Sequence, residues 1–412
     1  MRTRLAALPL AAALLAAAGL AHADDPIKIL FVGNSYTFGR ADPVMTYNAA
    51  NVHDLTAGFY AANQTGTNPW EPHPWGGVPG IFKQMTVEAG LNYDVSISAR
   101  NAATLRGQFL NTANADWNMR GNVASQDWGV VVLQEQSDAP LPAGKGKNAN
   151  AAQFQAYANQ FERFIHNGSA QTYTETQLYG SLAACMATGL SSGSCNTSRV
   201  IPANPNADAN TKVYLTDTWA RPDMAFAHKN ITNDPSTPDG APILDGTGTN
   251  ATLYYTNLQD MTTDLHNTIY AAAAANPKFA GVVPAGDAFQ LAVNSGLAAA
   301  TGFYDSNGVW QTPSGGIDLW WKDRLHASKY GSYLDALVQF GTITGKDPLS
   351  LGAGEQAALD LGIDSATALA LEKVASAQLG FTAAVPEPGS WALFGAGLAV
   401  IAGLRQRRQQ PR

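Results

Sequence analysis

The stretch from Ile27 to Thr37, IKILFVGNSYT, constrains the fold of this chain more than any other stretch. Its apolar first part stops at Gly33, and an apolar run of this length that ends at glycine predicts a buried strand of a parallel sheet. Polar residues follow at once, among them Ser35. Ligands of open α/β sheets bind at the carboxyl ends of the strands. We therefore expect Ser35 to stand where a catalytic nucleophile would act.

A serine hydroxyl needs a base, and the segment from Trp320 to Ser328 supplies a candidate. Asp323 and His326 are three residues apart. This spacing lets the carboxylate bind one imidazole nitrogen and leaves the other nitrogen free to face a serine. The alternative is that Ser35 is an ordinary turn serine and that Asp323 caps a helix beside a surface histidine.

Alternating strand and helix patterns run along most of the chain. Short apolar and β-branched runs predict strands, and stretches with helical apolar periodicity predict helices. The predicted strands cover residues 27–33, 93–98, 128–133, 212–216 and 279–284, and the predicted helices 78–90, 149–165, 253–275, 286–295 and 328–342. This alternation predicts a flavodoxin-like three-layer α/β/α sandwich with a five-stranded parallel sheet. Residues 39–77, 166–210 and 223–248 are predicted to be irregular insertions.

The two motifs resemble those of the SGNH/GDSL hydrolases. The first block of that family is a Gly-Asp/Asn-Ser turn after strand one, and its last block is Asp-x-x-His. Residues 33–35 (Gly-Asn-Ser) and 323–326 (Asp-Arg-Leu-His) match both blocks in type and order. The resemblance spans roughly residues 27–342. It implies a serine ester hydrolase in which Ser35, His326 and Asp323 are nucleophile, base and orienting acid, without a metal.

The same resemblance implies an oxyanion hole. Its expected donors are the backbone N–H of Ser35, a backbone N–H near Ala102, where the family has a glycine, and a side-chain amide after the strand at 128–133. The family has an asparagine in that third block, whereas this chain offers Gln134 and Gln136. A glutamine amide is an equivalent N–H donor. The alternative is that both glutamines only cap the sheet.

Further residues are expected at the same edge of the sheet. Asn34 and Tyr36 flank the nucleophile, and Trp219 and Arg221 follow the strand at 212–216. We expect these four side chains to line the substrate cleft. For Arg221, a structural ion pair is the alternative.

The two ends of the chain carry targeting signals. Residues 1–23 have a basic start, an apolar core and an Ala-His-Ala cleavage site, which predicts an export signal. An exported chain meets an oxidising compartment, so the only two cysteines, Cys185 and Cys195, are expected to form a disulfide.

Residues 385–412 begin Val-Pro-Glu-Pro, continue with a short apolar stretch at 391–404, and end in arginines. This arrangement is similar to a PEP-CTERM sorting signal with a short transmembrane helix, the alternative being a plain C-terminal anchor. The resemblance implies processing by signal peptidase and an exosortase in a Gram-negative cell, transient membrane anchoring, and release to the cell surface or matrix. Residues 24–345 would be the hydrolase domain and 346–384 a helical extension or linker.

Several functional classes are excluded by the sequence. A net charge of −7 and a pI near 5.5 leave no basic stripe for nucleic acid. We find no P-loop, dinucleotide motif or CxxC, so we expect no cofactor. His53 and His73 lack the spacing of a metal site. Ser191 lies in a GxSxG pattern, but we expect loops on both sides of it instead of the strand and helix that this motif needs.

The substrate is the least constrained property. The sorting signal and the tryptophans of residues 69–75 favour acetyl or other acyl groups on an exopolysaccharide. A lipase or arylesterase is an alternative, although the polar insertion at 39–77 does not resemble an apolar lid. A different alternative is a non-catalytic surface protein that binds carbohydrate or matrix on a decayed hydrolase fold.

Overall fold

The computed structural model of the chain describes residues 25–62, 70–113, 117–234, 236–237 and 240–381. The predicted export signal at 1–23 and the predicted sorting signal at 385–412, with its short transmembrane helix, lie outside the described residues. Within the described part of the chain, no helix is both long enough and apolar enough to cross a membrane.

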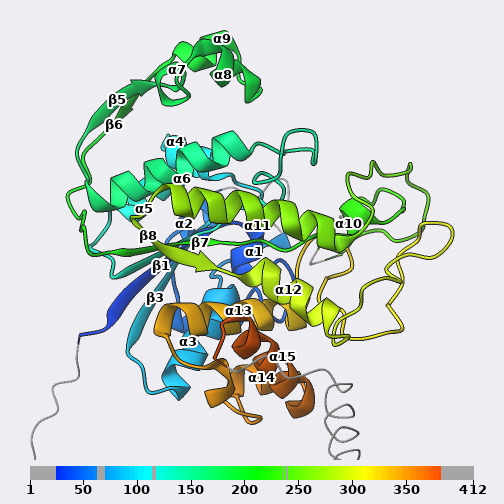
Figure 1. Cartoon of the computed structure of the whole chain (residues 1–412). Coiled ribbons are helices and arrows are strands. Elements are labelled where there is room, and N and C mark those ends of the chain that lie inside the picture. The colour runs from blue at the N-terminus through cyan, green and yellow to red at the C-terminus, as the bar shows by residue number, and fades with distance from the viewer. Residues whose placement is uncertain (1–24, 63–69, 114–116, 235, 238–239, 382–412) are drawn as a thin grey trace, which may run out of the picture.

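The centre of the molecule is a six-stranded parallel sheet with the strand order β2-β3-β1-β4-β7-β8 (Figure 1). Its strands are β1 (Ile27–Gly33), β2 (His53–Asp54), β3 (Tyr93–Ala99), β4 (Val130–Leu133), β7 (Lys212–Thr216) and β8 (Phe279–Val283). Without β2, this is the flavodoxin-like order 2-1-3-4-5. The predicted fold is therefore confirmed.

The sixth strand was not predicted. β2 lies at the sheet edge beside β3 and belongs to the insertion that we expected to be irregular. The same insertion contains a 3₁₀ turn, Ala49–Asn51, and helix α2, Ala57–Ala62. Two strand residues are too few to produce an alternating pattern, and pairing with β3 is a long-range contact that sequence periodicity does not record.

Helices cover both faces of the sheet. They are α1 (Ser35–Phe38), α3 (Gly77–Glu88), α4 (Leu105–Leu110), α5 (Met119–Val123), α6 (Ala151–His166), α10 (Pro222–Ala225), α11 (Leu258–Ala275), α12 (Ala285–Asn294), α13 (Lys329–Thr344), α14 (Gln356–Asp360) and α15 (Ser365–Gln378). Side chains of α3, α12 and α13 form one hydrophobic core, and those of α4, α5 and α6 form the other.

Strand β1 shows how the sequence builds these two cores. Ile29 and Phe31 belong to the core under α3 and α13, whereas Leu30 and Val32 belong to the core under α6. Successive strand residues point to opposite faces, so a continuous apolar run is what a doubly covered strand requires. Helix α15 packs against α12 and α13, and α14 packs against α3 and α15, so both extend the first layer (Figure 1).

Residues 166–210 form an ordered arm, which corrects the expectation of irregular structure. Strands β5 (Gln171–Thr174) and β6 (Ser198–Ile201) make an antiparallel hairpin that carries α7 (Glu175–Leu178), α8 (Leu182–Ala187) and α9 (Ser192–Asn196) away from the sheet (Figure 1). Ser191, in the GxSxG pattern, is the N-cap of α9, and no strand precedes it.

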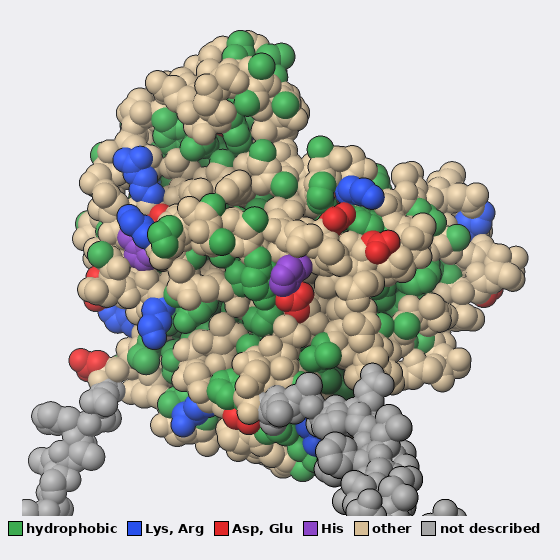
Figure 2. Space-filling model, in the orientation of Figure 1, with side chains coloured by type: hydrophobic (Ala, Val, Ile, Leu, Met, Phe, Trp, Pro, Cys, Tyr) green, Lys and Arg blue, Asp and Glu red, His purple; other side chains and the backbone are tan. Residues whose placement is uncertain are grey.

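Polar and covalent links hold the arm together. Cys185 and Cys195 form a disulfide between α8 and α9, with an S–S distance of 2.08 Å. The buried carboxylate of Glu175 binds Arg106 at 2.5 Å and Arg199 at 2.7 Å. Such links leave no apolar period in the sequence, which is why the arm was not predicted. Figure 2 shows hydrophobic side chains on its surface.

Candidate active site

The Ser35 turn lies at the end of β1, next to β4, where the order of the strands reverses. Asn34 fixes the turn, because its Oδ1 accepts from the Tyr36 N–H at 3.1 Å and its Nδ2 donates to the carbonyls of Ala103 and Glu135 at 3.1 and 3.2 Å. Asn34 is itself buried. It therefore fixes the position of Ser35, and its side-chain polar atoms are all hydrogen-bonded within the protein.

Ser35, His326 and Asp323 form one hydrogen-bonded chain. Ser35 Oγ donates to His326 Nε2 at 2.8 Å, and His326 Nδ1 donates to Asp323 Oδ2 at 2.5 Å. Both residues are largely buried, with 6% of the surface of Ser35 and 8% of that of His326 exposed. The two motifs are 291 residues apart in the sequence, and the fold brings them into contact.

The carboxylate of Asp323 is set up to stay ionised. Burial would raise its pKa, but the facing His326 and hydrogen bonds to its oxygens outweigh burial and hold the pKa of Asp323 below its usual value. Its Oδ1 accepts from the backbone N–H groups of Leu325 and His326 at 3.0 and 2.9 Å. With Oδ1 occupied in this way, Oδ2 is left to orient the imidazole.

Two aromatic residues hold the histidine loop in place. The carbonyl of Leu325 accepts from Tyr36 Oη at 2.8 Å and from Trp219 Nε1 at 3.2 Å. The rings of Tyr36 and Trp219 stack with centroids 4.0 Å apart, and both residues are buried. Both were expected to line the cleft. Their polar atoms instead fix the backbone beside His326.

Two backbone N–H groups in and near the Ser35 turn have no hydrogen-bond partner among the described residues. Neither the N–H of Ser35 nor that of Ala102 donates to another described residue. Ala102 has a φ of 55°, in the left-handed region that favours glycine. The chain thus keeps, with an alanine, the backbone conformation that suits a glycine at the expected oxyanion loop.

Replacing Ala102 with glycine is expected to stabilise the fold by up to ~1 kcal/mol. A left-handed L-residue costs roughly 1–2 kcal/mol, of which the larger unfolded-state entropy of glycine offsets roughly 0.4–1 kcal/mol. The control is Ala103→Gly, because Ala103 does not have a positive φ. Urea unfolding should show opposite signs for the two variants, and equal destabilisation would contradict strain at Ala102.

The two glutamines after β4 have different surroundings. Gln134 is buried. Its Oε1 accepts hydrogen bonds from the Asn34 N–H at 3.2 Å and from Thr37 Oγ1 at 2.9 Å. Its Nε2 donates a hydrogen bond to the Glu135 carbonyl. Gln136 is only partly buried, and its Nε2 donates to Ser137 Oγ at 3.2 Å. Gln134 therefore holds the Ser35 turn through Asn34 and Thr37.

Glu135 belongs to the site but was not singled out in the sequence. Its Oε1 accepts from the N–H of Leu105 at 2.9 Å and of Gln136 at 2.7 Å, so it ties the Ala102 loop to the end of β4. Burial raises its pKa to about 8, and these two hydrogen bonds only partly counteract that effect. An acidic residue directly after a buried strand was the signal that could have revealed it.

Replacing Glu135 with glutamine is expected to change how stability depends on pH. The folded pKa of about 8 exceeds the unfolded value, which is ~4.3. The stability contribution of Glu135 is therefore full below the unfolded pKa and is lost as pH rises through the folded pKa, by ~3–5 kcal/mol in all. The glutamine side chain of the variant would keep an acceptor oxygen but cannot ionise.

Urea unfolding on both sides of this pH window measures the effect. The free energy of unfolding of the wild type should fall across the window by clearly more than that of Glu135→Gln. The matched control is Glu88→Gln, since Glu88 accepts two hydrogen bonds at an exposed position. Parallel pH profiles for Glu135→Gln and the wild type would show that Glu135 does not titrate in this range.

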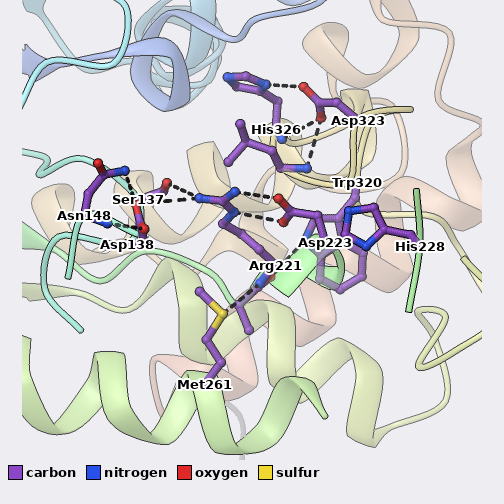
Figure 3. A network of polar contacts seen from close by, with 12 residues as sticks. Ser137, Asp138, Asn148, Arg221, Asp223, His228, Met261, Trp320, Asp323 and His326 are labelled. Carbon is purple, nitrogen blue, oxygen red and sulfur yellow. Dashed lines mark hydrogen bonds and ion pairs between the residues drawn. The ribbon is translucent and has the colours of Figure 1, made fainter. Parts of the chain in front are cut away.

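Arg221 joins the edge of the site to neighbouring loops (Figure 3). It binds Asp223 through two nitrogens, at 2.9 and 2.5 Å, and Ser137 Oγ at 3.0 Å, and its Nη1 lies 3.8 Å from Asp138. Burial would lower the pKa of Arg221, but these carboxylates raise it. The structural ion pair considered for Arg221 is thus present, and the side chain keeps 12% exposure.

A polar pocket of about 240 Å³ opens beside this network. Its walls include Lys147, Arg221, His228 and Asn230. His228 also lines a small hollow of about 10 Å³ that reaches Asp323, and Figure 3 shows His228 and Asp323 on the same side of the network. Trp320 does not obstruct this region, because its ring is buried against Phe289 and Phe303.

Comparison with known sequences identifies one motif. A family model for the PEP-CTERM protein-sorting motif matches residues 384–408. This motif indicates export and membrane-anchored sorting in Gram-negative bacteria and implies processing by an exosortase. A search of curated proteins gave no match.

Several solved structures are similar to this chain at low identity. A candidate SGNH hydrolase from Slackia heliotrinireducens is 17% identical, with 77% of this chain and 100% of that chain covered and a TM-score of 0.33. A DUF4886 family protein from Bacteroides uniformis is 13% identical, with 89% and 99% covered and a TM-score of 0.39. Phospholipase A1 from Streptomyces albidoflavus is 10% identical, with 78% and 99% covered and a TM-score of 0.32. The sorting motif recognised in the sequence is confirmed, and proteins described as SGNH or GDSL hydrolases are among the similar structures.

Proposed function

We propose that this chain is an exported serine ester hydrolase that removes acetyl or other short acyl groups from carbohydrate. The observation that carries the proposal is the hydrogen-bonded chain from Ser35 through His326 to Asp323 at the carboxyl end of β1. A nucleophile, a base in contact with it and a group that orients the base are the parts that acyl transfer requires.

The acylation step follows from these contacts. His326 Nε2 takes the proton of Ser35 Oγ as the oxygen bonds to the ester carbonyl carbon. The carbonyl oxygen becomes an oxyanion, which the free N–H groups of Ser35 and Ala102 are placed to stabilise, each by ~3 kcal/mol. His326 then gives the proton to the alcohol oxygen, and the ester C–O bond breaks. Asp323 stabilises the imidazolium while it lasts.

Deacylation reverses the roles. His326 takes a proton from water, the water oxygen bonds to the acyl carbon, and Ser35 Oγ leaves with the proton that His326 returns. A third oxyanion donor would come from Gln136 more readily than from Gln134, because both polar atoms of the buried Gln134 amide have protein partners under the turn.

The pocket beside Arg221 supports a carbohydrate substrate. This pocket is lined by charged, amide and hydroxyl-bearing side chains, including Lys147, Arg221, Asn230 and Tyr254 and the carboxylates of Asp138 and Asp223. Such groups suit a hydroxyl-rich sugar chain better than a fatty acyl chain, which needs an apolar channel. Export with a PEP-CTERM motif would bring the enzyme to polysaccharide outside the cell.

Acyl preference tests the proposal. The purified protein should hydrolyse p-nitrophenyl acetate faster than the butyrate and octanoate esters, and it should release acetate from acetylated xylan or an acetylated exopolysaccharide. A preference for octanoate would instead indicate a lipase. A folded protein that is inactive on every ester and polysaccharide would contradict the proposal and favour the binding-protein alternative.

A further inference from the structure

Three metal-ligating side chains meet between β7, α11 and α12. Asp217 directly follows β7, His266 lies on α11, and Asp287 lies in the first turn of α12. One ligand atom from each residue lies within 4.8 Å of the other two. His266 Nδ1 is 2.9 Å from Asp287 Oδ2. Figure 2 shows a histidine beside an acidic side chain on the face formed by α11 and α12.

The cluster contains a buried oxygen without a partner. Asp217 has an exposed fraction of 0%, and no described residue donates a hydrogen bond to its Oδ1. Its Oδ2 accepts from the N–H of Asp287 at 3.1 Å. A buried carboxylate of this kind needs either a proton or a cation beside it.

The ion pairs of the described residues leave the charge of the cluster unbalanced. Asp287 pairs with His266, and no lysine or arginine of the described chain forms an ion pair with Asp217 or Asp287. At most one positive charge, on His266, therefore faces two carboxyl groups. A divalent cation would neutralise both carboxylates and would use the free Oδ1.

The donor set selects the kind of cation. We propose that Asp217, His266 and Asp287 bind one divalent transition-metal ion, with zinc as the best match. Zinc takes carboxylate oxygen and imidazole nitrogen at roughly 2.0–2.2 Å in a tetrahedral arrangement, in which water supplies a fourth ligand. An imidazole nitrogen disfavours calcium and magnesium, which take oxygen ligands.

The neighbours of the cluster fit this assignment. Tyr270 Oη donates to Asp287 Oδ2 at 3.0 Å and stacks on the His266 ring with centroids 4.0 Å apart. Outer hydrogen bonds of this kind orient metal ligands. The His266 side chain keeps 42% exposure, which leaves a route for the ion to reach the cluster.

The site would act by joining structural elements and not by taking part in ester hydrolysis. It shares no residue with the Ser35 triad, and it links β7 to α11 and α12. Asp217 is also two residues before Trp219, whose Nε1 holds the Leu325 carbonyl beside His326. Bound zinc would therefore stabilise the end of the sheet that supports the histidine loop.

Zinc binding by the whole chain tests the proposal without a catalytic assay. Protein dialysed against EDTA is titrated with ZnCl₂ against a competing chelator dye, and its melting temperature is followed. We expect one zinc per chain and a melting temperature that rises with zinc, because a ligand that binds only the folded state stabilises it. His266→Ala should weaken binding by more than ~100-fold, and Tyr270→Phe by ~10–100-fold.

Two further variants complete the test. His53 pairs with Asp94 at 2.9 Å on the surface, without a third ligand, so His53→Ala should bind zinc like the wild type. Asp217→Asn should abolish the zinc-induced rise in melting temperature, even if its metal-free stability is unchanged. Binding that His266→Ala leaves intact, or CaCl₂ binding without ZnCl₂ binding, would overturn the assignment.

Discussion

Replacing Ser35 with alanine is expected to lower kcat for p-nitrophenyl acetate by ~10⁴- to 10⁶-fold, because the acyl group then has no nucleophile to bond to. The residual rate would come from the oxyanion donors and from His326 acting on water. The fold should persist, since the substitution removes one hydroxyl whose described partner is His326 at 2.8 Å. Initial rates beside thermal unfolding curves measure both effects.

The control for this variant is Ser191→Ala. Ser191 is the serine of the GxSxG pattern, and its Oγ caps α9 by accepting from the Ser194 N–H at 3.1 Å. Losing this cap should cost ~1 kcal/mol of stability and leave kcat unchanged. Normal turnover by Ser35→Ala together with loss of turnover by Ser191→Ala would move the nucleophile to the arm and refute the triad.

Replacing Asp323 with asparagine is expected to lower kcat by ~10⁴-fold at neutral pH. Asp323 Oδ1 accepts from two backbone N–H groups, so the asparagine oxygen should take that place and its NH₂ should face His326 Nδ1. Nδ1 must then be the acceptor, which puts the ring proton on Nε2. An Nε2–H pointing at Ser35 cannot accept the hydroxyl proton.

The same variant has a stability signature. The folded pKa of Asp323 is lowered, so its ionisation stabilises the fold above the unfolded pKa of ~3.9, and this contribution is lost as pH falls through the folded pKa. The difference in unfolding free energy between wild type and Asp323→Asn should therefore shrink below roughly pH 4. Urea unfolding across this range is the measurement.

Asp305→Asn is the matched control for Asp323→Asn. Asp305 Oδ1 also accepts from two backbone N–H groups, at 2.8 and 2.9 Å, but on an exposed loop without a histidine partner. It should leave kcat unchanged. An equal fall in kcat for both aspartate variants would mean that the loss reflects loop structure and not the imidazole tautomer.

Local sequence patterns were enough to predict the strands, the helices and the parallel sheet of this protein. Continuous apolar runs such as residues 27–33 predicted strands covered on both faces, and their alternation with helical periods predicted the parallel sheet. These signals are read from neighbouring residues, because the periods of strand and helix are local properties of the backbone. The Ser35 and His326 motifs could be proposed for the same reason, since each lies within a few consecutive residues.

Packing between segments that are distant in the sequence decided the roles of individual site residues and the structure of the arm. The roles of Gln134, Glu135, Tyr36 and Trp219 depend on partners from loops far away in the sequence, such as the Leu325 carbonyl. The arm is held by a disulfide and by ion pairs, which leave no hydrophobic period.

The sequence by itself thus determined the layered fold and the sorting motif, and it supplied the residues that we propose for acyl transfer. Only the tertiary structure shows which polar groups hold the site together through hydrogen bonds and which N–H groups have no partner among the described residues. It also shows that Asp217, His266 and Asp287 lie close together. The physical reason is that hydrogen bonding and charge compensation act through space, whereas a sequence records only order along the chain.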